Sequence, residues 1–395
     1  MERPSARARS RGRPLSSSAR DFSLILLLAS LLAAGTAVSG VVFADANADG
    51  RREPGEAGVA GVVVTDGTTV VTTDAAGEYR LADVTAPHVF VVTPGDRRAV
   101  GSWYWATAAR VDFPLASAPL PARWRFAHLS DPHVEPATAA RLRAALEGAA
   151  GRAADFALVS GDLVLDALRA DAATARTRYA AYDAVAAASP VPIRPVIGNH
   201  DVFGIDRRWS HATLGEPGYG KGLYEEREGP RYSAFNRGQV HFLVLDTVGV
   251  DDTRYYGLLD EAQLEWIRRE LRYVPAGLTV VTVGHIPLRS GALALSYAAE
   301  GVARSLLSVG GRTFYPHVVG NASALVDILK PYRWTLALQG HTHVAEKLPA
   351  DGGTPTRYHT APAVTRLPQA NPPSGFFMYE VEGGEVDEGE LVRLE

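Results

Sequence analysis

The sequence predicts a layered α/β domain preceded by a small all-β module. Two patterns and the composition support this prediction. After about residue 119, strand-like apolar runs alternate with helical segments, which favours an α/β layer structure with partly parallel sheets. Before that point, short β-branched runs alternate with Gly, Asp and Pro. Apolar residues make up 46% of the 395 residues, so the chain can bury a large core and a small one.

The first 39 residues have the composition of an export signal. Six arginines from Arg3 to Arg20 precede an apolar run over residues 24–37, and small residues lie at 37–40. These are the parts of a secretory signal peptide. The apolar run is shorter than the roughly 20 residues of a full membrane span, and an uncleaved N-terminal anchor is the alternative. Both interpretations predict a secreted or envelope-anchored protein, the second with membrane association through the N-terminus.

Charge and cysteine content exclude several classes of protein. The net charge of −4 gives no electrostatic basis for binding nucleic acid, so we expect no nucleic-acid partner. The absence of cysteine excludes a disulfide framework and lipid attachment through a thiol. Stability outside the cytoplasm must therefore come from packing and bound ions.

Residues 40–118 are expected to form a small antiparallel β-sandwich. Turn residues separate its short β-branched runs. The runs are residues 41–43, 62–64, 69–72, 79–81 and 89–92. Small residues and prolines at 116–121 predict a linker, which starts the second domain at residue 119 and lets it run to residue 395.

A candidate calcium loop lies inside this module. Asp45, Asn47, Asp49 and Glu56 have the spacing of an EF-hand-type loop, and Gly50 permits its sharp turn. Helices do not obviously flank the loop. It resembles instead the calcium-binding B-type repeats of bacterial serine-aspartate adhesins and related prealbumin-like sandwich modules. The alternative is an Asx-rich turn that binds no ion.

The second domain is expected to alternate strands and helices in order along the chain. Expected strands are residues 125–129, 156–159, 193–197, 278–283 and 334–338, with a hairpin of 232–235 and 240–246. Expected helices cover residues 137–150 and about 168–188, and a third helix starts near Asp260, with Asp260 as N-cap and Gln263 three residues later.

Short polar clusters follow five of these strands. They are Asp131-Pro132-His133, Gly161-Asp162, Gly198-Asn199-His200-Asp201, Gly284-His285 and Gly340-His341-Thr342-His343. Ligands of α/β sheets bind at the carboxyl ends of strands, where the loops converge. The clusters mix carboxylate oxygens with imidazoles, as a pair of divalent metal ions requires.

Two such ions can hold a hydroxide between them and neutralise the charge of a phosphate during in-line attack. They need a shared carboxylate, and Asp162 is suited to that bridge. Asp131 and His133 can reach one ion from a tight loop, whereas His341 and His343 could each face a different ion. Asn199 and His285 supply further ligand atoms.

As an ordered set, the five clusters resemble the full signature of the calcineurin-like metallophosphoesterase superfamily, from about Arg125 to the C-terminus. The resemblance implies a four-layer α/β/β/α sandwich and a dinuclear centre of Fe, Mn, Zn or a similar pair. It assigns one metal to Asp131, His133, Asp162 and His343, and the other to Asp162, Asn199, His285 and His341. It also implies that His200 stays off the metals and protonates the leaving oxygen, oriented by Asp201.

The residues themselves agree on His200, because a histidine beside a carboxylate suits a general acid near neutral pH. Its alternatives are a further metal ligand or a structural role. Asp166 could support the site by a hydrogen bond or could initiate a helix. Four other histidines lack partners at a diagnostic spacing, among them His317. Arg207, Arg208, Arg231 and Arg289 either contact a phosphate or form ordinary surface charge.

The sequence therefore predicts an exported metal-dependent phosphoesterase that acts on a phosphomonoester or a phosphodiester. The motifs do not distinguish these two, because both are cleaved on this scaffold. The alternative is a non-catalytic cell-surface binding or scaffold protein that keeps metals for structure only.

Overall fold

The computed structural model describes residues 35–291, 306–350, 353–365 and 373–395. Contacts divide the chain into Met1–Ala34 and a compact unit, Gly35–Glu395. Most of the predicted export segment therefore lies outside the described residues. Within the described part of the chain, no helix is long and apolar enough to cross a bilayer.

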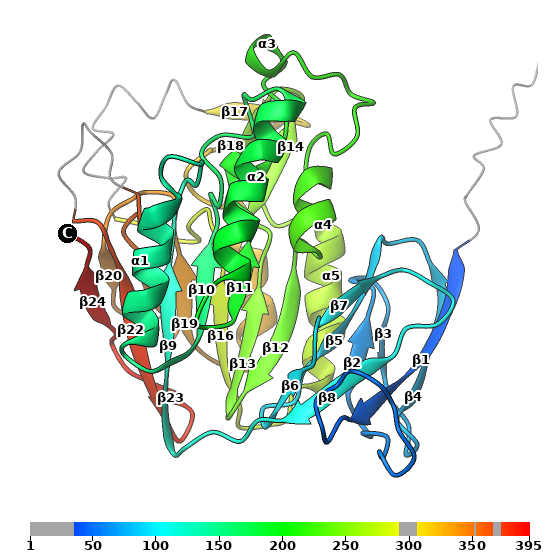
Figure 1. Cartoon of the computed structure of the whole chain (residues 1–395). Coiled ribbons are helices and arrows are strands. Elements are labelled where there is room, and N and C mark those ends of the chain that lie inside the picture. Colours follow the sequence, from blue (N-terminus) through cyan, green and yellow to red (C-terminus); the bar gives the residue numbers. More distant parts are fainter. Residues whose placement is uncertain (1–34, 292–305, 351–352, 366–372) are drawn as a thin grey trace, which may run out of the picture. The chain divides into compact units, whose positions relative to one another are not determined.

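The N-terminal module is a sandwich of two four-stranded sheets around its own apolar core (Figure 1). One sheet has the order β4-β1-β8-β6 and contains β1 (Thr36–Ala44), β4 (Glu78–Val84), β6 (Arg97–Ala99) and β8 (Phe113–Ser117). The other has the order β3-β2-β5-β7 and contains β2 (Val63–Thr65), β3 (Val70–Thr72), β5 (His88–Val92) and β7 (Tyr104–Ala106). The predicted all-β module is present, but it is not wholly antiparallel, because β1 and β8 pair in parallel.

Strand β1 begins four residues before the expected start of the module. Val38 pairs with Leu81 of β4, and the Val38 side chain is fully buried. Cleavage among residues 37–40, where the sequence has small residues, would remove part of a core strand. The structure therefore places the start of the folded module at Thr36.

The second domain contains two six-stranded mixed sheets. The first has the order β11-β10-β9-β22-β23, with β24 also on β22: β9 (Arg123–Leu129), β10 (Ala154–Ser160), β11 (Ile193–Val196), β22 (Gly375–Glu382), β23 (Glu385–Val386) and β24 (Glu390–Arg393). The second has the order β12-β13-β16-β19-β21-β20: β12 (Ser233–Arg237), β13 (Val240–Val244), β16 (Thr279–Val283), β19 (Arg333–Gln339), β20 (Glu346–Leu348) and β21 (Arg357–Thr360). Strands β9, β10 and β11 run parallel, as do β13, β16, β19 and β21.

The two sheets pack face to face through an apolar layer. The ring of Phe126 on β9 meets the ring of Phe242 on β13 edge-on, with centroids 5.4 Å apart. Helices pack on the outer faces, and Figure 1 shows two of them, α1 and α2, side by side. In the described residues, the helices are α1 (Ala139–Ala150), α2 (Ala172–Ala187), α3 (Arg207–Ser210), α4 (Gly222–Glu228), α5 (Glu261–Glu270), α8 (Ala322–Leu329) and the 3-10 turns η1 (Asn199–Asp201) and η2 (Leu271–Tyr273). The four-layer α/β/β/α fold is confirmed.

Local sequence signals account for most of these elements. Asp260 caps α5 as expected, because its carboxylate accepts a hydrogen bond from the Gln263 amide at 2.8 Å. The expected hairpin forms as β12 and β13. Two further hairpins extend from loops: β14 (Val248–Asp251) with β15 (Arg254–Gly257), and β17 (Leu307–Val309) with β18 (Arg312–Phe314).

Helix α2 starts later than expected. Its N-cap is Asp171, whose carboxylate accepts a hydrogen bond from the Thr174 amide at 2.8 Å. The interpretation of Asp166 as a helix initiator is therefore wrong. Residues 163–171 instead form a loop that continues past the end of β10, and this loop carries Asp166 to the functional site described below.

Candidate metal centre

The predicted ligands meet at the carboxyl ends of the strands that precede them. Five of them adopt left-handed backbone conformations, with φ between +43° and +72°. Such conformations are uncommon for residues other than glycine and cluster at functional sites. These five residues are Asp131, His133, Asp162, His341 and His343. The backbone is thus held in unfavourable turns that direct these side chains to one place.

A first group of side chains contains Asp131, His133, Asp162 and His343, whose ligand atoms all lie within 4.8 Å of one another. The Nε2 atoms of His133 and His343 are 3.2 Å apart, and His343 Nε2 lies 3.0 Å from Asp131 Oδ1. Both carboxylates are essentially inaccessible to solvent. Buried carboxylates and imidazoles whose ligand atoms lie this close together are typical ligands of a divalent metal ion.

A second group contains Asp162, His285 and His341, again with ligand atoms within 4.8 Å. His285 Nε2 lies 3.2 Å from both Asp162 Oδ1 and His341 Nδ1. The amide oxygen of Asn199 lies 3.1 Å from the same His285 nitrogen. The side chains of all seven predicted ligands therefore lie within these two groups or in contact with them.

Asp162 belongs to both groups. Its Oδ1 faces His285 at 3.2 Å, whereas its Oδ2 faces His133 at 3.8 Å. The loop after β11 passes directly over this carboxylate, and a Cβ atom at Gly198 would collide with the backbone nitrogen and carboxylate of Asp162. One carboxylate shared between two ligand groups is the arrangement that a bridging ligand requires.

Hydrogen bonds at the rear of the rings show that these residues fit metal ions. His285 Nδ1 lies 2.8 Å from the Ser160 carbonyl, and His133 Nδ1 lies 3.3 Å from the Leu165 carbonyl. A carbonyl oxygen can only accept, so each Nδ1 carries the hydrogen, and in the neutral ring Nε2 presents its lone pair to the centre. Metal-ligating histidines are oriented by such bonds.

The electrostatics of the cluster are dominated by its two buried carboxylates. Burial opposes ionisation of Asp162, but His285 and His200 outweigh it and hold its pKa well below the ordinary value. Burial likewise lowers the pKa of His285, but Asp162 and Asp131 outweigh it and raise that pKa to about 9. The site therefore attracts positive charge, as a cation-binding centre must.

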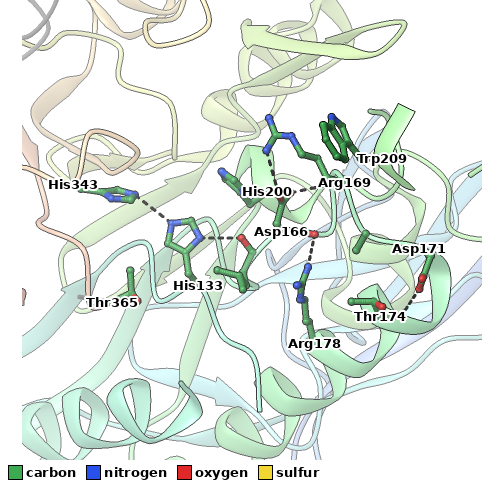
Figure 2. A pocket seen from close by; sticks show the side chains of 12 residues that line it. His133, Asp166, Arg169, Asp171, Thr174, Arg178, His200, Trp209, His343 and Thr365 are labelled. Carbon is green, nitrogen blue, oxygen red and sulfur yellow. Dashed lines mark hydrogen bonds and ion pairs between the residues drawn. The ribbon is translucent and has the colours of Figure 1, made fainter. Parts of the chain in front are cut away.

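His200 lies beside the two groups, and one of its ring nitrogens faces Asp162 while the other faces Asp166. Its Nε2 is 4.0 Å from Asp162 Oδ2, and its Nδ1 is 3.3 Å from Asp166 Oδ1 (Figure 2). Burial would lower the pKa of His200, but the carboxylates of Asp162 and Asp166 outweigh it and raise that pKa. Asp166 is therefore the carboxylate that faces the back of the His200 ring.

The expected role of Asp201 is wrong in this respect. Its carboxylate accepts hydrogen bonds from the backbone nitrogens of Gly198 at 2.7 Å and Val164 at 3.1 Å. Asp201 is fully buried and joins the two loops that carry Asp162 and Asn199. Adjacent residues on the turn η1 point their side chains in different directions, so sequence adjacency did not bring Asp201 to the His200 ring.

Comparison with known proteins decides the family. Residues 125–345, more than half of the chain, match the family model described as calcineurin-like phosphoesterase. The chain belongs to the calcineurin-like phosphoesterase family. Residues 46–102 match the model of the N-terminal domain of calcineurin-like phosphoesterase, which covers most of the β-sandwich module. The protein is thus a metal-dependent phosphoesterase with the N-terminal domain of its own family.

Solved structures similar to this phosphoesterase include a dimetal phosphatase from Danio rerio. The two sequences are 14% identical, the match covers 69% of this chain and 97% of that chain, and the TM-score is 0.46. A purple acid phosphatase from yellow lupin (Lupinus luteus) has 13% identity, 87% and 67% coverage, and a TM-score of 0.46. The search of curated proteins found no match.

The metal centre of the phosphoesterase opens into a hollow of about 680 Å³. Figure 2 shows His133, His200 and His343 on one side of this hollow and Arg169, Arg178 and Trp209 on the other. Arg169 pairs with Asp166 at 3.2 Å, and the indole of Trp209 is 67% exposed. The sequence analysis had not singled out these three residues, because no motif spacing connects them with the clusters.

His317 is a further residue whose contacts the sequence did not reveal. Its Nδ1 lies 2.7 Å from His341 Nε2, on the side of the His341 ring that faces away from His285. His317 belongs to neither group of candidate ligands, but it contacts one of their members. Only the partner distance in space reveals this pair, since the two histidines lie in different loops.

The arginines proposed as phosphate contacts are engaged elsewhere. Arg231 pairs with the buried Asp246 at 2.5 Å and with the partly exposed Glu225 at 3.2 Å. Arg207 pairs with Asp252, and Arg208 pairs with Asp206 at 3.1 Å. Arg289 stacks near the Tyr358 ring, with its guanidinium carbon 5.8 Å from the centroid. Arg208 is exposed, which agrees with the alternative of ordinary surface charge, whereas Arg207 and Arg231 are partly buried in ion pairs.

The candidate calcium loop is folded by its own hydrogen bonds. Asp45 accepts from the Gly50 amide at 2.8 Å, and Glu56 accepts from the Ala46 amide at 2.9 Å. Asn47 donates to Asp49 at 3.1 Å. Among the described residues, the loop is not one of the places where three acidic or histidine side chains converge within 4.8 Å. Calcium binding at this loop stays a prediction.

Proposed function

We propose that this phosphoesterase hydrolyses a P–O ester bond at a dinuclear metal centre, with His200 as the proton donor. The observation that supports this most directly is the placement of Asp162 between the two ligand groups, with the His200 ring beside it and the hollow in front. In this arrangement the two ligand groups, which would bind the phosphate oxygens through their metals, and the proton donor His200 all face the hollow.

Asp131, His133, Asp162 and His343 would hold one metal, and Asp162, Asn199, His285 and His341 would hold the other. When bound, such a pair of ions activates water as the nucleophile and neutralises the charge of the phosphate. We propose Fe, Mn or Zn, because mixed imidazole and carboxylate ligands suit these metals.

His200 has the geometry of a general acid. Asp166 Oδ1 lies 3.3 Å from Nδ1 on one side of the ring, and Nε2 on the other side faces the centre. The negative charge of Asp166 stabilises the protonated ring, which must carry a proton before it can donate one. His200 then donates the Nε2 proton to the ester oxygen as that oxygen leaves phosphorus.

The hollow would receive the leaving group of the substrate. Its wall contains Arg169 and Arg178 together with the acids Asp166 and Asp171, and the exposed indole of Trp209 adds an apolar surface. Both a monoester and a diester fit this description, because each presents an oxyanion to the metals and an organic group to the hollow.

Two measurements test the proposed function together. Elemental analysis of the purified chain is expected to find two transition metals and would also detect calcium in the Asp45–Glu56 loop. The metal-loaded protein is expected to release p-nitrophenol from p-nitrophenyl phosphate or its bis ester, with loss of roughly a thousandfold or more in Asp162→Ala because several kcal/mol of stabilisation disappear. Bound metal without turnover of any ester would favour a non-catalytic scaffold protein.

We propose in addition that the protein is exported. The arginine-rich start and the apolar run over residues 24–37 support this proposal, and the folded module begins only at Thr36. Fractionation of expressing cells, followed by intact mass, tests it. Loss of a segment ending before Thr36 indicates a cleaved signal, an unshortened envelope-bound chain indicates an anchor, and a full-length cytoplasmic protein contradicts export.

A further inference from the structure

A second cavity lies away from the metal centre, between the N-terminal module and the second domain. Its volume is about 450 Å³, and residues from both parts of the compact unit line it. The lining contains four arginines, Arg97, Arg98, Arg194 and Arg237, and one acid, Asp155. None of the predicted metal ligands lines this cavity.

Arg194 on strand β11 is held between two aromatic rings in this cavity. Its guanidinium carbon lies 3.8 Å from the centroid of Trp103 in the module and 4.5 Å from the centroid of Phe235 on β12. Burial lowers the pKa of Arg194 to about 9, so the group is still charged at neutral pH. The two rings hold the charged guanidinium of Arg194 in place by stacking on it.

The guanidinium nitrogens of Arg194 have fewer interactions than its stacked faces. Within the described part of the chain, the guanidinium has no hydrogen bond or ion pair, and its Nη1 is buried without a partner. A buried charged donor that lacks a partner is costly, because it loses its hydration and gains nothing in exchange. Stacking on two rings compensates the charge only in part.

The remaining charges leave the cavity strongly positive. Asp155 is committed to Arg237, with bonds of 2.5 and 2.7 Å. Arg97 and Arg98 stand on β6 of the module, and among the described residues neither has an acidic partner within 4.0 Å. Three uncompensated guanidinium groups thus line one cavity of a chain whose net charge is −4.

We infer that this cavity is a binding site for a small anion that carries phosphate or carboxylate groups. Guanidinium groups bind both oxyanions through paired N–H···O bonds. A cavity of this volume lies in the usual range for small-molecule sites and holds more than a single water molecule. The anion would bridge Arg194 of the second domain and Arg97 or Arg98 of the module. This inference does not rest on the proposed catalytic function.

Calorimetric titration of the metal-loaded full-length chain with inorganic phosphate tests the inference. The centre itself is expected to bind phosphate, so Asp162→Ala is titrated in parallel to isolate the cavity. In that background a saturable event is expected to persist. Adding Arg194→Met is expected to weaken it about tenfold or more, since charge-assisted hydrogen bonds are lost. Arg143→Met, at an exposed position of α1 outside the cavity, is the matched control.

A second variant covers the case in which Arg194→Met unfolds the protein. Arg98 is exposed, so Arg98→Met is expected to fold normally and to weaken phosphate binding severalfold. Displacement of phosphate by succinate assigns the site to carboxylates as well, and failure of succinate to compete assigns it to phosphate groups. The inference is overturned if Asp162→Ala alone abolishes all phosphate binding, or if Arg98→Met and Arg194→Met bind phosphate like the Arg143→Met control.

Discussion

The Nδ1 atom of His200 lies 3.3 Å from a carboxylate oxygen of Asp166, on the far side of the ring from the metal ligands. This pair places a charged acceptor behind the proposed proton donor. The role that the sequence analysis assigned to Asp201 therefore passes to Asp166.

Replacing Asp166 by Asn is expected to slow the release of poor leaving groups. The variant keeps the shape of the side chain but removes the charge that holds the His200 proton, so kcat for an alkyl phosphate should fall roughly tenfold to a hundredfold. Release of p-nitrophenol, which needs little proton donation, should fall much less. A series of phosphate esters with leaving groups of different pKa measures this as a steeper slope of kcat.

Asp171→Asn is the matched control, because Asp171 lines the same hollow but caps α2 instead of facing His200. Asn is also a good N-cap, so stability should hardly change. Equal losses on all leaving groups in Asp166→Asn would contradict the role of His200 as the acid.

Removing the imidazole of His317 is expected to loosen one metal. His317 Nδ1 lies 2.7 Å from His341 Nε2 and fixes the orientation of the His341 ring. Loss of such an orienting partner typically lowers metal affinity tenfold to a hundredfold. Competition with a chelator on the metal-loaded protein measures the affinity of His317→Ala.

His317→Asn serves as the conservative variant, because one polar atom of the asparagine amide takes the position of the His317 Nδ1 atom. It should recover a large part of the metal affinity. If both variants retain metal like the unmodified protein, His317 does not position His341.

Gly198→Ala is expected to abolish activity and to lower stability. The added Cβ would collide with the backbone nitrogen and carboxylate of Asp162, which cannot move without losing both ligand groups. Gly215→Ala is the matched control, since no heavy atom lies within 4 Å of its added Cβ. Turnover and thermal unfolding measured side by side check the prediction. An active Gly198→Ala variant would show that the loop after β11 can retreat from Asp162.

Acid is expected to destabilise the protein partly through His359, which lies on β21 and belongs to neither ligand group. Burial, with Arg357 next, lowers the pKa of His359 from 6.5 to about 4. The unfolded chain therefore takes up this proton below pH 6.5, and the folded chain does so only near pH 4. The contribution to stability is complete above pH 6.5 and is lost as the pH falls through about 4, at a total of about 3 kcal/mol.

Urea unfolding at several pH values checks this expectation in the unmodified protein and in His359→Gln. The glutamine can still reach Tyr379, whose hydroxyl lies 3.0 Å from His359 Nδ1, but it does not titrate. The variant should lose less stability between pH 7 and pH 4. Parallel curves for the two proteins would mean that His359 is not the group responsible.

The sequence alone predicted the fold class and the seven residues that meet in the two candidate ligand groups, because metal chemistry admits few residue types and each cluster directly follows its own strand. His133 and His343 could be named without coordinates for that reason. Asp260 as a helix cap was equally predictable, since its partner Gln263 is three residues away.

Only the tertiary structure decided which residues serve those ligands. Asp166 reaches His200 because α2 begins at Asp171 and leaves a free loop, and His317 meets His341 across two loops. The aromatic clamp on Arg194 joins two domains whose contact no local pattern encodes. Contacts of this kind depend on packing between distant segments. The conformation of a short motif, in contrast, depends mainly on the residues within the motif itself.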